Sequence, residues 1–351
     1  MSPSHIRFAL PSLLLVLVLG LSGSLAGADF QVVTIDTLRF EASIASQAIP
    51  PTPYFKLPFG KGPDQVGGSD QDPNHVTEGV PYAFRPQADG SVWVLDWVNQ
   101  ALKQFGPDGK LQAQRSLAGL FPRGEGVIRD FAPAPNDGFY LLSARDGKVL
   151  RTDAAGKVVV EIEGLTDARA IGTDAKGNLL VDMPTMNALL RFNPAGEIVD
   201  QYPLPQADLV NAGLCTSSEG QPYFIRGSEQ AVELCRFTQA SPTREVVVAT
   251  FANDVPAERK ARFVSAKVLG IDATGNVYVE VVACDNDGVI HRHRVSRVSP
   301  DGKVLASADI RVIPYLSPDL PRHLTVMPDG RLLGFYVYSP HWHLVTWALG
   351  K

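Results

Sequence analysis

A surplus of positive charge is the first thing that this sequence lacks. Its 351 residues include 32 Lys and Arg against 37 Asp and Glu, so the formal net charge at pH 7 is −5. Proteins that bind the phosphate backbone of DNA or RNA present a basic face, because much of their affinity comes from neutralising phosphates. The composition therefore argues against a nucleic-acid partner.

Long apolar runs are also missing, with one exception near the N-terminus. Ala9 to Leu21 is an apolar run that follows the basic Arg7, and Ala26-Gly27-Ala28 fits the small-x-small cleavage rule. This pattern predicts a secretory signal peptide over residues 1–28, with an uncleaved N-terminal anchor as the alternative. We therefore expect a secreted or periplasmic protein that has no membrane span after cleavage of the signal peptide.

Cysteine is scarce, and the three thiols are Cys215, Cys235 and Cys284. An odd number leaves at least one of them unpaired in an exported protein. Cys215 and Cys235 fall on predicted strands with another strand between them, roughly 9.6 Å apart, which is beyond the reach of a disulfide. Cys235 with Cys284 would be less strained, but three free thiols are the expectation.

Helical periodicity is missing as well. No long segment repeats its apolar residues every 3.6 positions, and the best helical candidate is the short stretch Asp254 to Phe263. The sequence also gives no support to a nucleophile elbow, a P-loop or a Ser-His-Asp order. The fold should therefore be all-β, without a common catalytic signature to identify its function.

What the sequence does contain is an internal repeat. Six units each carry a turn glycine, at spacings of 48, 39, 43, 55 and 55 residues: Gly90, Gly138, Gly177, Gly220, Gly275 and Gly330. A second turn glycine follows in five of the units: Gly109, Gly156, Gly196, Gly302 and Gly350. Between these glycines lie short segments rich in Val, Ile, Leu, Phe and Tyr, which are typical of strands joined by hairpins.

Each unit is predicted to form four antiparallel strands, A to D. In the third unit they cover about residues 168–173, 178–183, 188–193 and 197–203. A four-stranded sheet of this size cannot bury both of its faces alone, so it has to stack on its neighbours. Four-stranded units at this period predict a β-propeller, here with six blades.

The two ends of the chain predict how the ring closes. The sixth unit provides three strands before the C-terminus, near residues 323–327, 332–338 and 343–347. The unmatched run Tyr54 to Phe59 is expected to supply the fourth strand, which would cover the open sheet edge. The propeller would then span residues 54–351. Residues 29–53 would form an N-terminal segment with an additional rim strand within Phe30 to Ile44.

The first repeat, ADGSVWVLDWVNQALKQFGPDGK, resembles an NHL repeat, whose pattern is roughly D-x-x-G-N-x-Y-V-x-D-x-x-N-x-R-I-x-x-F-x-x-x-G. The third unit matches this pattern at eight positions: Asp174, Gly177, Asn178, Asp182, Asn187, Arg191, Phe192 and Gly196. The fifth unit matches at Asp272, Gly275, Asn276 and Tyr278. The resemblance covers roughly residues 54–350. It implies a six-bladed propeller but no particular activity, because function on such scaffolds depends on the individual site.

Six-bladed propellers of this kind include metal-dependent lactonases of the SMP-30/gluconolactonase type and streptogramin-lyase-like enzymes. Glu78-Gly79-Val80 is similar to the metal-binding Glu-Gly-Pro of the lactonases, so the resemblance implies Glu78 as a metal ligand. The later Asn and Asp ligand motifs have no good counterpart. Pro135 to Asp137 has the right letters, but it falls in the first turn of a blade, at the wrong end.

The face that carries the long connections is the predicted location of a binding site. In an up-and-down blade the B–C turns and the D–A connections share one face of the ring, and loops on a rigid scaffold commonly bind ligands. Eight residues before each turn glycine, one residue per blade should face the channel mouth: Tyr82, Asp130, Arg169, Ala212, Lys267 and Arg322, with His323 beside the last. Three cations against one acid would attract a carboxylate or phosphate. Alternatively, these side chains pair with one another around a water-filled channel.

One loop has the spacing of a calcium site. Asp70, Asp72 and Asn74 stand at alternate positions ahead of Glu78, and calcium prefers several hard oxygens from one loop. His75 replaces the glycine of an EF-hand loop, so a solvated polar loop is the alternative. A divalent metal such as calcium is the one cofactor that the sequence suggests.

Two His-x-His pairs, His291/His293 and His341/His343, could each offer two imidazoles to a metal, or could lie on the rim without one. Asp and Asn residues near the B–C turns are instead expected to bind turn backbone: Asp96, Asn99, Asp182 and Asn187.

Together these features predict an exported, monomeric propeller that acts as a binding or interaction module. Its partner would be a protein or a small anionic ligand at the channel mouth. A metal-dependent lactonase or lyase that uses Glu78 is one alternative, and a structural role in an envelope assembly is another.

Overall fold

The computed structural model describes residues 39–40, 47–68, 80–121, 128–206, 209–311, 323–338 and 341–350. All of them belong to one compact unit, residues 33–351. The predicted signal peptide and five of the candidate site residues lie outside the described residues: Asp70, Asp72, Asn74, Glu78 and Arg322. No helix in the described ranges is long and apolar enough to cross a membrane.

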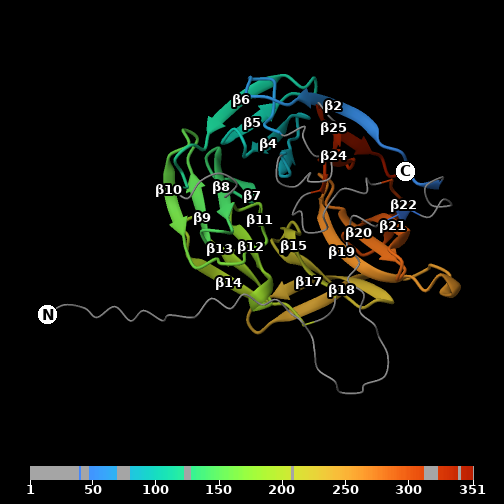
Figure 1. The fold of residues 1–351 in the computed structure, drawn as a ribbon. Helices are drawn as coiled ribbons and strands as arrows, with labels where there is room; N and C mark the ends of the chain where they lie inside the picture. The colour runs from blue at the N-terminus through green and yellow to red at the C-terminus, as the bar shows by residue number, and fades with distance from the viewer. Residues whose placement is uncertain are drawn as a thin grey trace, which may run out of the picture. The chain divides into compact units, whose positions relative to one another are not determined.

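Six antiparallel sheets follow one another around a ring, with the A strands on the inside and the D strands on the outside (Figure 1). The prediction of an all-β, six-bladed propeller is confirmed. The strands of each blade, in the order A to D, are: blade 1, β3 (Phe84–Pro86), β4 (Val92–Asp96), β5 (Ala101–Phe105) and β6 (Leu111–Ser116); blade 2, β7 (Asp130–Ala134), β8 (Gly138–Ser143), β9 (Lys148–Thr152) and β10 (Val158–Ile162); blade 3, β11 (Ala170–Thr173), β12 (Leu179–Met183), β13 (Ala188–Phe192) and β14 (Ile198–Pro203); blade 4, β15 (Leu209–Thr216), β16 (Pro222–Gly227), β17 (Ala231–Gln239) and β18 (Arg244–Ala252); blade 5, β19 (Arg262–Ile271), β20 (Val277–Cys284), β21 (Val289–Val298) and β22 (Val304–Asp309); blade 6, β23 (Leu324–Val326), β24 (Leu332–Tyr338), β25 (His341–Trp347) and β2 (Thr52–Pro58).

The blades are held together by apolar side chains from both faces of each sheet. In β4, Val92 and Val94 join a cluster shared with blade 6, whereas Trp93 and Leu95 join a cluster shared with blade 2. Successive residues of a strand point to opposite faces, so a strand between two other blades is buried throughout. Each of the six clusters formed by the described residues joins two neighbouring blades, which gives the ring six interfaces.

Turn geometry and close packing explain why two of the repeat positions, Gly177 and Gly138, are glycines. Gly177 has φ +77°, and a Cβ there would lie 2.6 Å from Cγ of Pro135 in blade 2. The A–B turn of blade 2 instead uses Asn136 and Asp137, with φ of +59° and +55°. Gly138 closes this turn, as predicted, and its amide donates to the carbonyl oxygen of Pro135 at 3.4 Å. It begins β8, where a Cβ would lie 1.9 Å from the carbonyl oxygen of Thr152, so the glycine is required by close packing.

The ring closes through the N-terminal part of the chain, as predicted. β2 pairs antiparallel with β25, with Lys56 opposite His343 and Pro58 opposite His341, and so becomes the outer strand of blade 6. Farther out, β1 (Arg39–Phe40) runs parallel to the start of β21 and adds a fifth strand to the sheet of blade 5. This is the described part of the segment that was expected to form an extra rim strand.

Two smaller expectations have different outcomes. The helical candidate Asp254 to Phe263 was wrong, because it contains only the short 3-10 helix η3 (Ala257–Arg259) before β19 begins at Arg262. All three cysteines are free. Cys215 on β15 and Cys235 on β17 have β16 between them, as the strand order had predicted.

Candidate functional site

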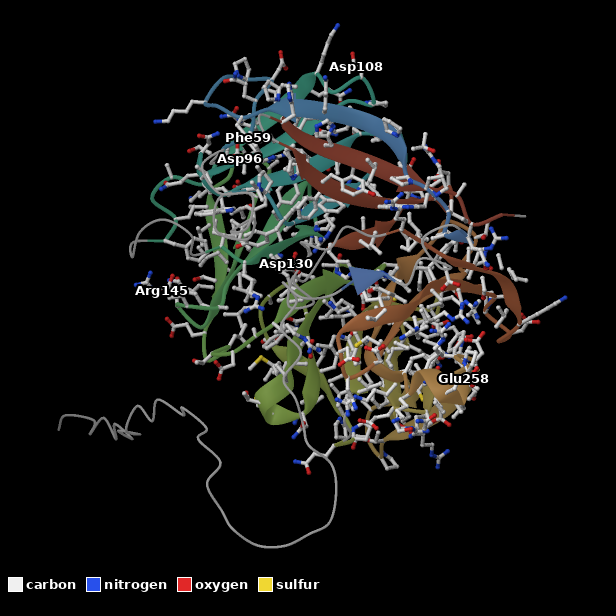
Figure 2. The ribbon with its side chains drawn as sticks, turned by 45° about the vertical axis from the view of Figure 1, so that its right-hand side comes forward. Phe59, Asp96, Asp108, Asp130, Arg145 and Glu258 are labelled. Atoms are coloured by element: carbon white, nitrogen blue, oxygen red, sulfur yellow. The ribbon has the colours of Figure 1, made fainter. Side chains whose placement is uncertain are left out.

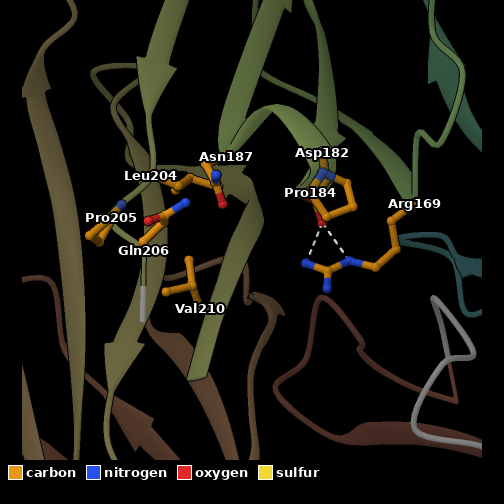
Figure 3. A pocket seen from close by; sticks show the side chains of 8 residues that line it. All are labelled: Arg169, Asp182, Pro184, Asn187, Leu204, Pro205, Gln206 and Val210. Atoms are coloured by element: carbon orange, nitrogen blue, oxygen red, sulfur yellow. Dashed lines mark hydrogen bonds and ion pairs between the residues drawn. The ribbon is translucent and has the colours of Figure 1, made fainter. Parts of the chain in front are cut away.

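An open cleft of about 430 Å³ lies between blades 3 and 4 (Figure 3). Its lining comes from the ends of strands and the connections between them: Arg169, Asp182, Pro184, Asn187, Leu204, Pro205, Gln206 and Val210. The lining therefore belongs to the B–C turn of blade 3, the start of its A strand, and the D–A connection that leads into blade 4. Four of these side chains are polar and four are apolar.

Backbone hydrogen bonds fix the walls of the cleft. The short 3-10 helix η2 (Pro184–Met186) forms the B–C turn and ends at Asn187, whose φ of +47° is left-handed. Asparagine tolerates this conformation better than most residues do. The Leu204 amide donates to the Asn187 carbonyl at 2.7 Å, which holds the D–A connection beside the B–C turn. The cleft is thus built from a turn and a connection that a backbone hydrogen bond holds together.

An ion pair between Arg169 and Asp182 lies at one end of the cleft. Nε of Arg169 donates to Oδ2 of Asp182 at 2.7 Å, and Nη2 lies 2.5 Å from the same oxygen. The carboxylate is buried, but 32% of the Arg169 side chain is exposed. Nη1 has no hydrogen-bond partner among the described residues, and in Figure 3 the third nitrogen of the guanidinium group points away from Asp182.

This ion pair provides a hydrogen-bond partner for only one of the two carboxylate oxygens of Asp182. Its Oδ1 is buried and has no hydrogen-bond partner in the described part of the chain. Burial raises the pKa of Asp182, although the charge and hydrogen bonds of Arg169, and the charge of Arg129, act in the opposite direction. On the other side of Arg169, the side-chain amide oxygen of Asn211 accepts a hydrogen bond from Nη2 at 3.2 Å.

Two other predicted mouth residues make contacts within the scaffold. The hydroxyl of Tyr82 donates to the carbonyl oxygen of Ile128 at 3.2 Å, and burial raises its pKa to about 12. Asp130 is fully buried, and its Oδ1 accepts from Nη2 of Arg85 at 2.8 Å while its Oδ2 accepts from the Ile171 amide at 3.0 Å. These bonds connect blades 1, 2 and 3. In the same set, Ala212 is buried in the core.

A second polar group lies between blades 5 and 6. Oε1 of the buried Glu280 is 2.7 Å from Nε2 of His293 and 2.9 Å from Nε2 of His323. Lys267 is the neighbour of Glu280 on the adjacent strand. The predicted mouth residues Lys267 and His323 therefore lie close enough for the charge of Lys267 to act on His323, and His323 contacts Glu280.

The protonation states in this group follow from burial and charge. Burial alone would raise the pKa of Glu280, but the charges and hydrogen bonds of His323 and His293 outweigh it and hold that pKa well below its usual range. Burial lowers the pKa of His323, with the charge of Lys267 acting in the same direction. At neutral pH Glu280 is thus ionised and His323 is neutral. His323 then donates from Nε2 and keeps a lone pair on Nδ1.

The His-x-His pairs do not act as pairs. His291 contacts Oδ2 of Asp285 at 2.7 Å, whereas His293 contacts Glu280. The rings of His341 and His343 lie edge to face, with centroids 5.9 Å apart. No group of three or more His, Cys, Asp or Glu residues in the described ranges is arranged to hold a metal ion.

Sequence reasoning missed Glu280 and misinterpreted Asp182. A charged residue in the middle of the apolar strand Val277–Cys284 was the available signal for Glu280, because an acid is rarely buried without a specific partner. Asp182 was interpreted as a turn residue, but it lines the cleft and pairs with Arg169. Asp96 does bind its turn, accepting from the Asn99 amide at 3.3 Å and from its side chain at 2.9 Å.

Comparisons with known proteins find likeness in structure but not in sequence. No family model matches the chain, and no curated protein matches it either. A streptogramin B lyase structure is 11% identical, covers 81% of this chain and 97% of its own, and has a TM-score of 0.45. Regucalcin from Agrobacterium tumefaciens, a calcium-binding protein, is 14% identical, covers 86% and 95%, and has a TM-score of 0.48.

A member of the DUF4221 family from Bacteroides vulgatus is 7% identical, covers 87% of this chain and 99% of its own, and has a TM-score of 0.54. At these identities a likeness concerns the fold alone. The chain is thus a six-bladed β-propeller of four-stranded antiparallel blades, with streptogramin B lyase and regucalcin among its structural neighbours.

Proposed function

We propose that this protein binds a small anionic ligand in the cleft between blades 3 and 4, and that Arg169 receives the carboxylate or phosphate of that ligand. The observation that carries the proposal is the partly exposed side chain of Arg169, which lines a cleft of about 430 Å³. Clefts of this size are typical of small-molecule sites, and a guanidinium group is well suited to bind carboxylate and phosphate.

The charge around the cleft supports an anion. The side chain of Arg169 is 32% exposed whereas that of its partner Asp182 is 2% exposed, so the cleft presents the positive group of the pair although the whole chain has a net charge of −5. A local field of this sign favours anionic ligands even on an acidic protein.

The chemistry of the lining supports binding more than catalysis. The described lining contains no His, Cys, Ser or Lys, and its single acid, Asp182, is already paired with Arg169. The apolar wall formed by Pro184, Leu204, Pro205 and Val210 suits the carbon skeleton of a small organic acid.

A thermal-shift screen of phosphate, dicarboxylates, monocarboxylates and phosphate monoesters tests the proposal, followed by calorimetric titration of each compound that stabilises the protein. Arg169→Gln should weaken binding of the best compound about tenfold or more, because a charge-assisted hydrogen bond is lost. The matched control is Arg145→Gln. Arg145 is exposed in the B–C turn of blade 2 and does not line the cleft, and Figure 2 shows it at the outer margin of the ribbon. Equal weakening by both substitutions, or no binding at all, would refute this function.

The Glu280 group favours a second candidate, an enzyme that transfers a proton at the channel mouth. Glu280 orients His323 through Nε2 and leaves its Nδ1 as a base, which is the arrangement that general base catalysis requires. The metal-dependent lactonase or lyase that would use Glu78 is a second form of this enzyme hypothesis. Metal analysis of the purified protein, with Glu78→Ala as comparison, tests the metal-dependent form. His323→Gln should abolish any lactonase or lyase activity that a substrate screen detects.

The proposed location is outside the cytoplasm. It rests on the signal-peptide pattern of residues 1–28. N-terminal sequencing of the protein isolated from its producing cells should begin at Asp29. A mature protein that still begins at Met1 would contradict cleavage.

A further inference from the structure

Two side-chain amides, those of Asn187 and Gln206, line the same cleft as Arg169. Asn187 ends the B–C turn of blade 3 and Gln206 belongs to the D–A connection, and both residues are exposed. Neither makes a side-chain hydrogen bond to another described residue. The Leu204 amide, two residues before Gln206, donates to the Asn187 carbonyl at 2.7 Å and so holds the two segments together. The cleft therefore presents two amide groups to a ligand.

Asp182 and Asn211 determine which nitrogen of Arg169 remains for a ligand. Nε and Nη2 both contact Oδ2 of Asp182, and Nη2 also donates to the side-chain oxygen of Asn211 at 3.2 Å. Nη1 has no such partner among the described residues. An anion is therefore expected to accept from Nη1, whereas Asn187 and Gln206 lie towards the other end of the cleft (Figure 3).

The chemistry of the lining indicates what the ligand carries besides its anionic group. A side-chain amide offers both a donor and an acceptor, which is the pattern that complements a peptide group. The rest of the lining is apolar and suits an aliphatic side chain: Pro184, Leu204, Pro205 and Val210. A ligand with a carboxylate, a peptide group and an aliphatic side chain therefore matches all three parts of the lining.

We propose that the ligand is a short peptide bound by its C-terminal end. Its terminal carboxylate accepts from Nη1 of Arg169, and its last peptide group accepts from the side-chain amide of Gln206 and donates to that of Asn187. This inference rests on the proposed function and makes it more specific. Because the cleft is open, the remainder of the peptide can continue into solvent.

A peptide matches the lining better than an acidic sugar or a free amino acid does. An acidic sugar has a carboxylate and hydrogen-bonding groups, but it has no aliphatic side chain for the apolar residues. The described lining also contains no aromatic side chain against which a sugar ring could stack. A free amino acid has an ammonium group in place of the peptide group. An ammonium group only donates, so it cannot accept from Gln206.

Matched ligands test the proposal on the wild-type protein by calorimetric titration. N-acetylglycyl-leucine should bind about tenfold or more tightly than its C-terminal amide, because the amide lacks the charge that Arg169 recognises. It should also bind roughly fivefold more tightly than 4-methylpentanoate, which keeps the carboxylate and the aliphatic chain of leucine but has no peptide group. Free leucine and galacturonate should both bind more weakly than N-acetylglycyl-leucine.

Two variants should each remove one of these preferences and keep the other. Gln206→Leu should reduce the preference for N-acetylglycyl-leucine over 4-methylpentanoate by about threefold or more, and should keep the preference for the free carboxylate over the C-terminal amide. Arg169→Gln should do the reverse. The matched control is Gln230→Leu, because Gln230 is exposed in the B–C turn of blade 4 and does not line the cleft. It should keep both preferences. Circular dichroism and the melting temperature confirm that each variant is folded.

The outcomes separate this inference from the function on which it rests. Equal affinity of the wild-type protein for N-acetylglycyl-leucine and 4-methylpentanoate would overturn the peptide assignment but leave Arg169 as an anion site. A Gln206→Leu variant that keeps both preferences would also overturn it, and so would tighter binding of galacturonate than of the peptide. Failure of every carboxylate and phosphate to bind would refute the proposed function itself.

Discussion

Nε2 of His323 lies 2.9 Å from Oε1 of Glu280, although 43 residues separate the two in the chain. His323 stands just before β23 of blade 6 and Glu280 lies on β20 of blade 5, so the contact crosses an interface between blades. Nε2 of His293 lies 2.7 Å from the same oxygen, and Lys267 on β19 is the residue opposite Glu280 in the strand pairing. A buried group of this kind makes the stability of the interface depend on pH.

We predict that the protein loses stability as the pH falls below 6.5, the usual pKa of a histidine. Burial lowers the pKa of His323 below its usual 6.5, so the unfolded chain takes up this proton more readily than the folded protein does. The contribution of His323 is complete above pH 6.5 and is lost as the pH falls towards its folded pKa. The pKa of Glu280 is held well below 4.5, so its contribution is lost only below pH 4.5. Urea unfolding at a series of pH values measures both losses.

The variant His323→Gln isolates the first loss. It should flatten the dependence of the unfolding free energy on pH below pH 6.5. His341→Gln, in the C strand of blade 6, serves as the control and should keep the wild-type slope. A slope unchanged by His323→Gln would show that this histidine is not the group responsible.

A buried ion pair fixes the segment that follows β2. Nζ of Lys103 lies 3.0 Å from Oδ2 of Asp96 and donates to the carbonyl oxygen of Gln65 at 2.7 Å, and both charged side chains are buried. Lys103→Met should lower the unfolding free energy by about 3 to 5 kcal/mol, because it leaves Asp96 buried without its countercharge. Lys110→Met, whose side chain is 81% exposed, should cost less than about 1 kcal/mol. Urea unfolding compares them, and similar costs would contradict a stabilising role for the buried pair.

Much of the fold was predictable because its signals are local. Turn glycines with positive φ and short β-branched runs recur along the chain, and they located all four strands of blade 3 to within two residues. Closure was predictable by counting, since the sixth unit lacked a strand and Tyr54 to Phe59 was left over. Gly138 shows the limit of the method: its spacing predicted the turn that it closes, but not the close packing against Thr152 that also requires a glycine.

The candidate site was less predictable because its contacts join residues of different blades. Alignment of the repeats placed Asp130 and Arg169 at equivalent positions, yet Asp130 is surrounded by donors from blades 1 and 3 whereas Arg169 opens into a cleft. Which neighbour each one meets depends on the twist and stacking of the blades, and those are not encoded at the position itself. Glu280 could have been noticed as a charge in an apolar strand, but its histidine partners could not.

Closure of the ring should depend on the packing of β2. Leu57 is 1% exposed and belongs to the cluster that joins blades 6 and 1. Leu57→Ala should lower the unfolding free energy by about 2 to 5 kcal/mol, because it removes buried apolar atoms and leaves a cavity. Val304→Ala on the outer strand of blade 5, where the side chain is 44% exposed, should cost no more than about 0.5 kcal/mol. Equal midpoints in urea would show that β2 does not stabilise the ring.

Asp130 provides a test of whether mouth residues serve the ligand or the scaffold. Its carboxylate accepts from Arg85 of blade 1 and from the Ile171 amide of blade 3, and the side chain is fully buried. Asp130→Asn should lower the unfolding free energy by about 3 kcal/mol, because it leaves the Arg85 charge without its partner. The affinity of the folded variant for an anionic ligand in the cleft should remain that of the wild type.

The double variant Asp130→Asn with Arg85→Met should cost less than the sum of the two single substitutions, because the charge and its partner are then removed together. Calorimetric titration below the unfolding temperature, paired with urea unfolding, separates the two roles. A variant that retains wild-type stability but loses affinity would place Asp130 in the ligand site, as the repeat alignment had suggested. A variant that loses stability and keeps its affinity would assign Asp130 to the scaffold. Of the two residues that the repeat alignment places at equivalent positions, Arg169 and not Asp130 would then bind the ligand in the cleft.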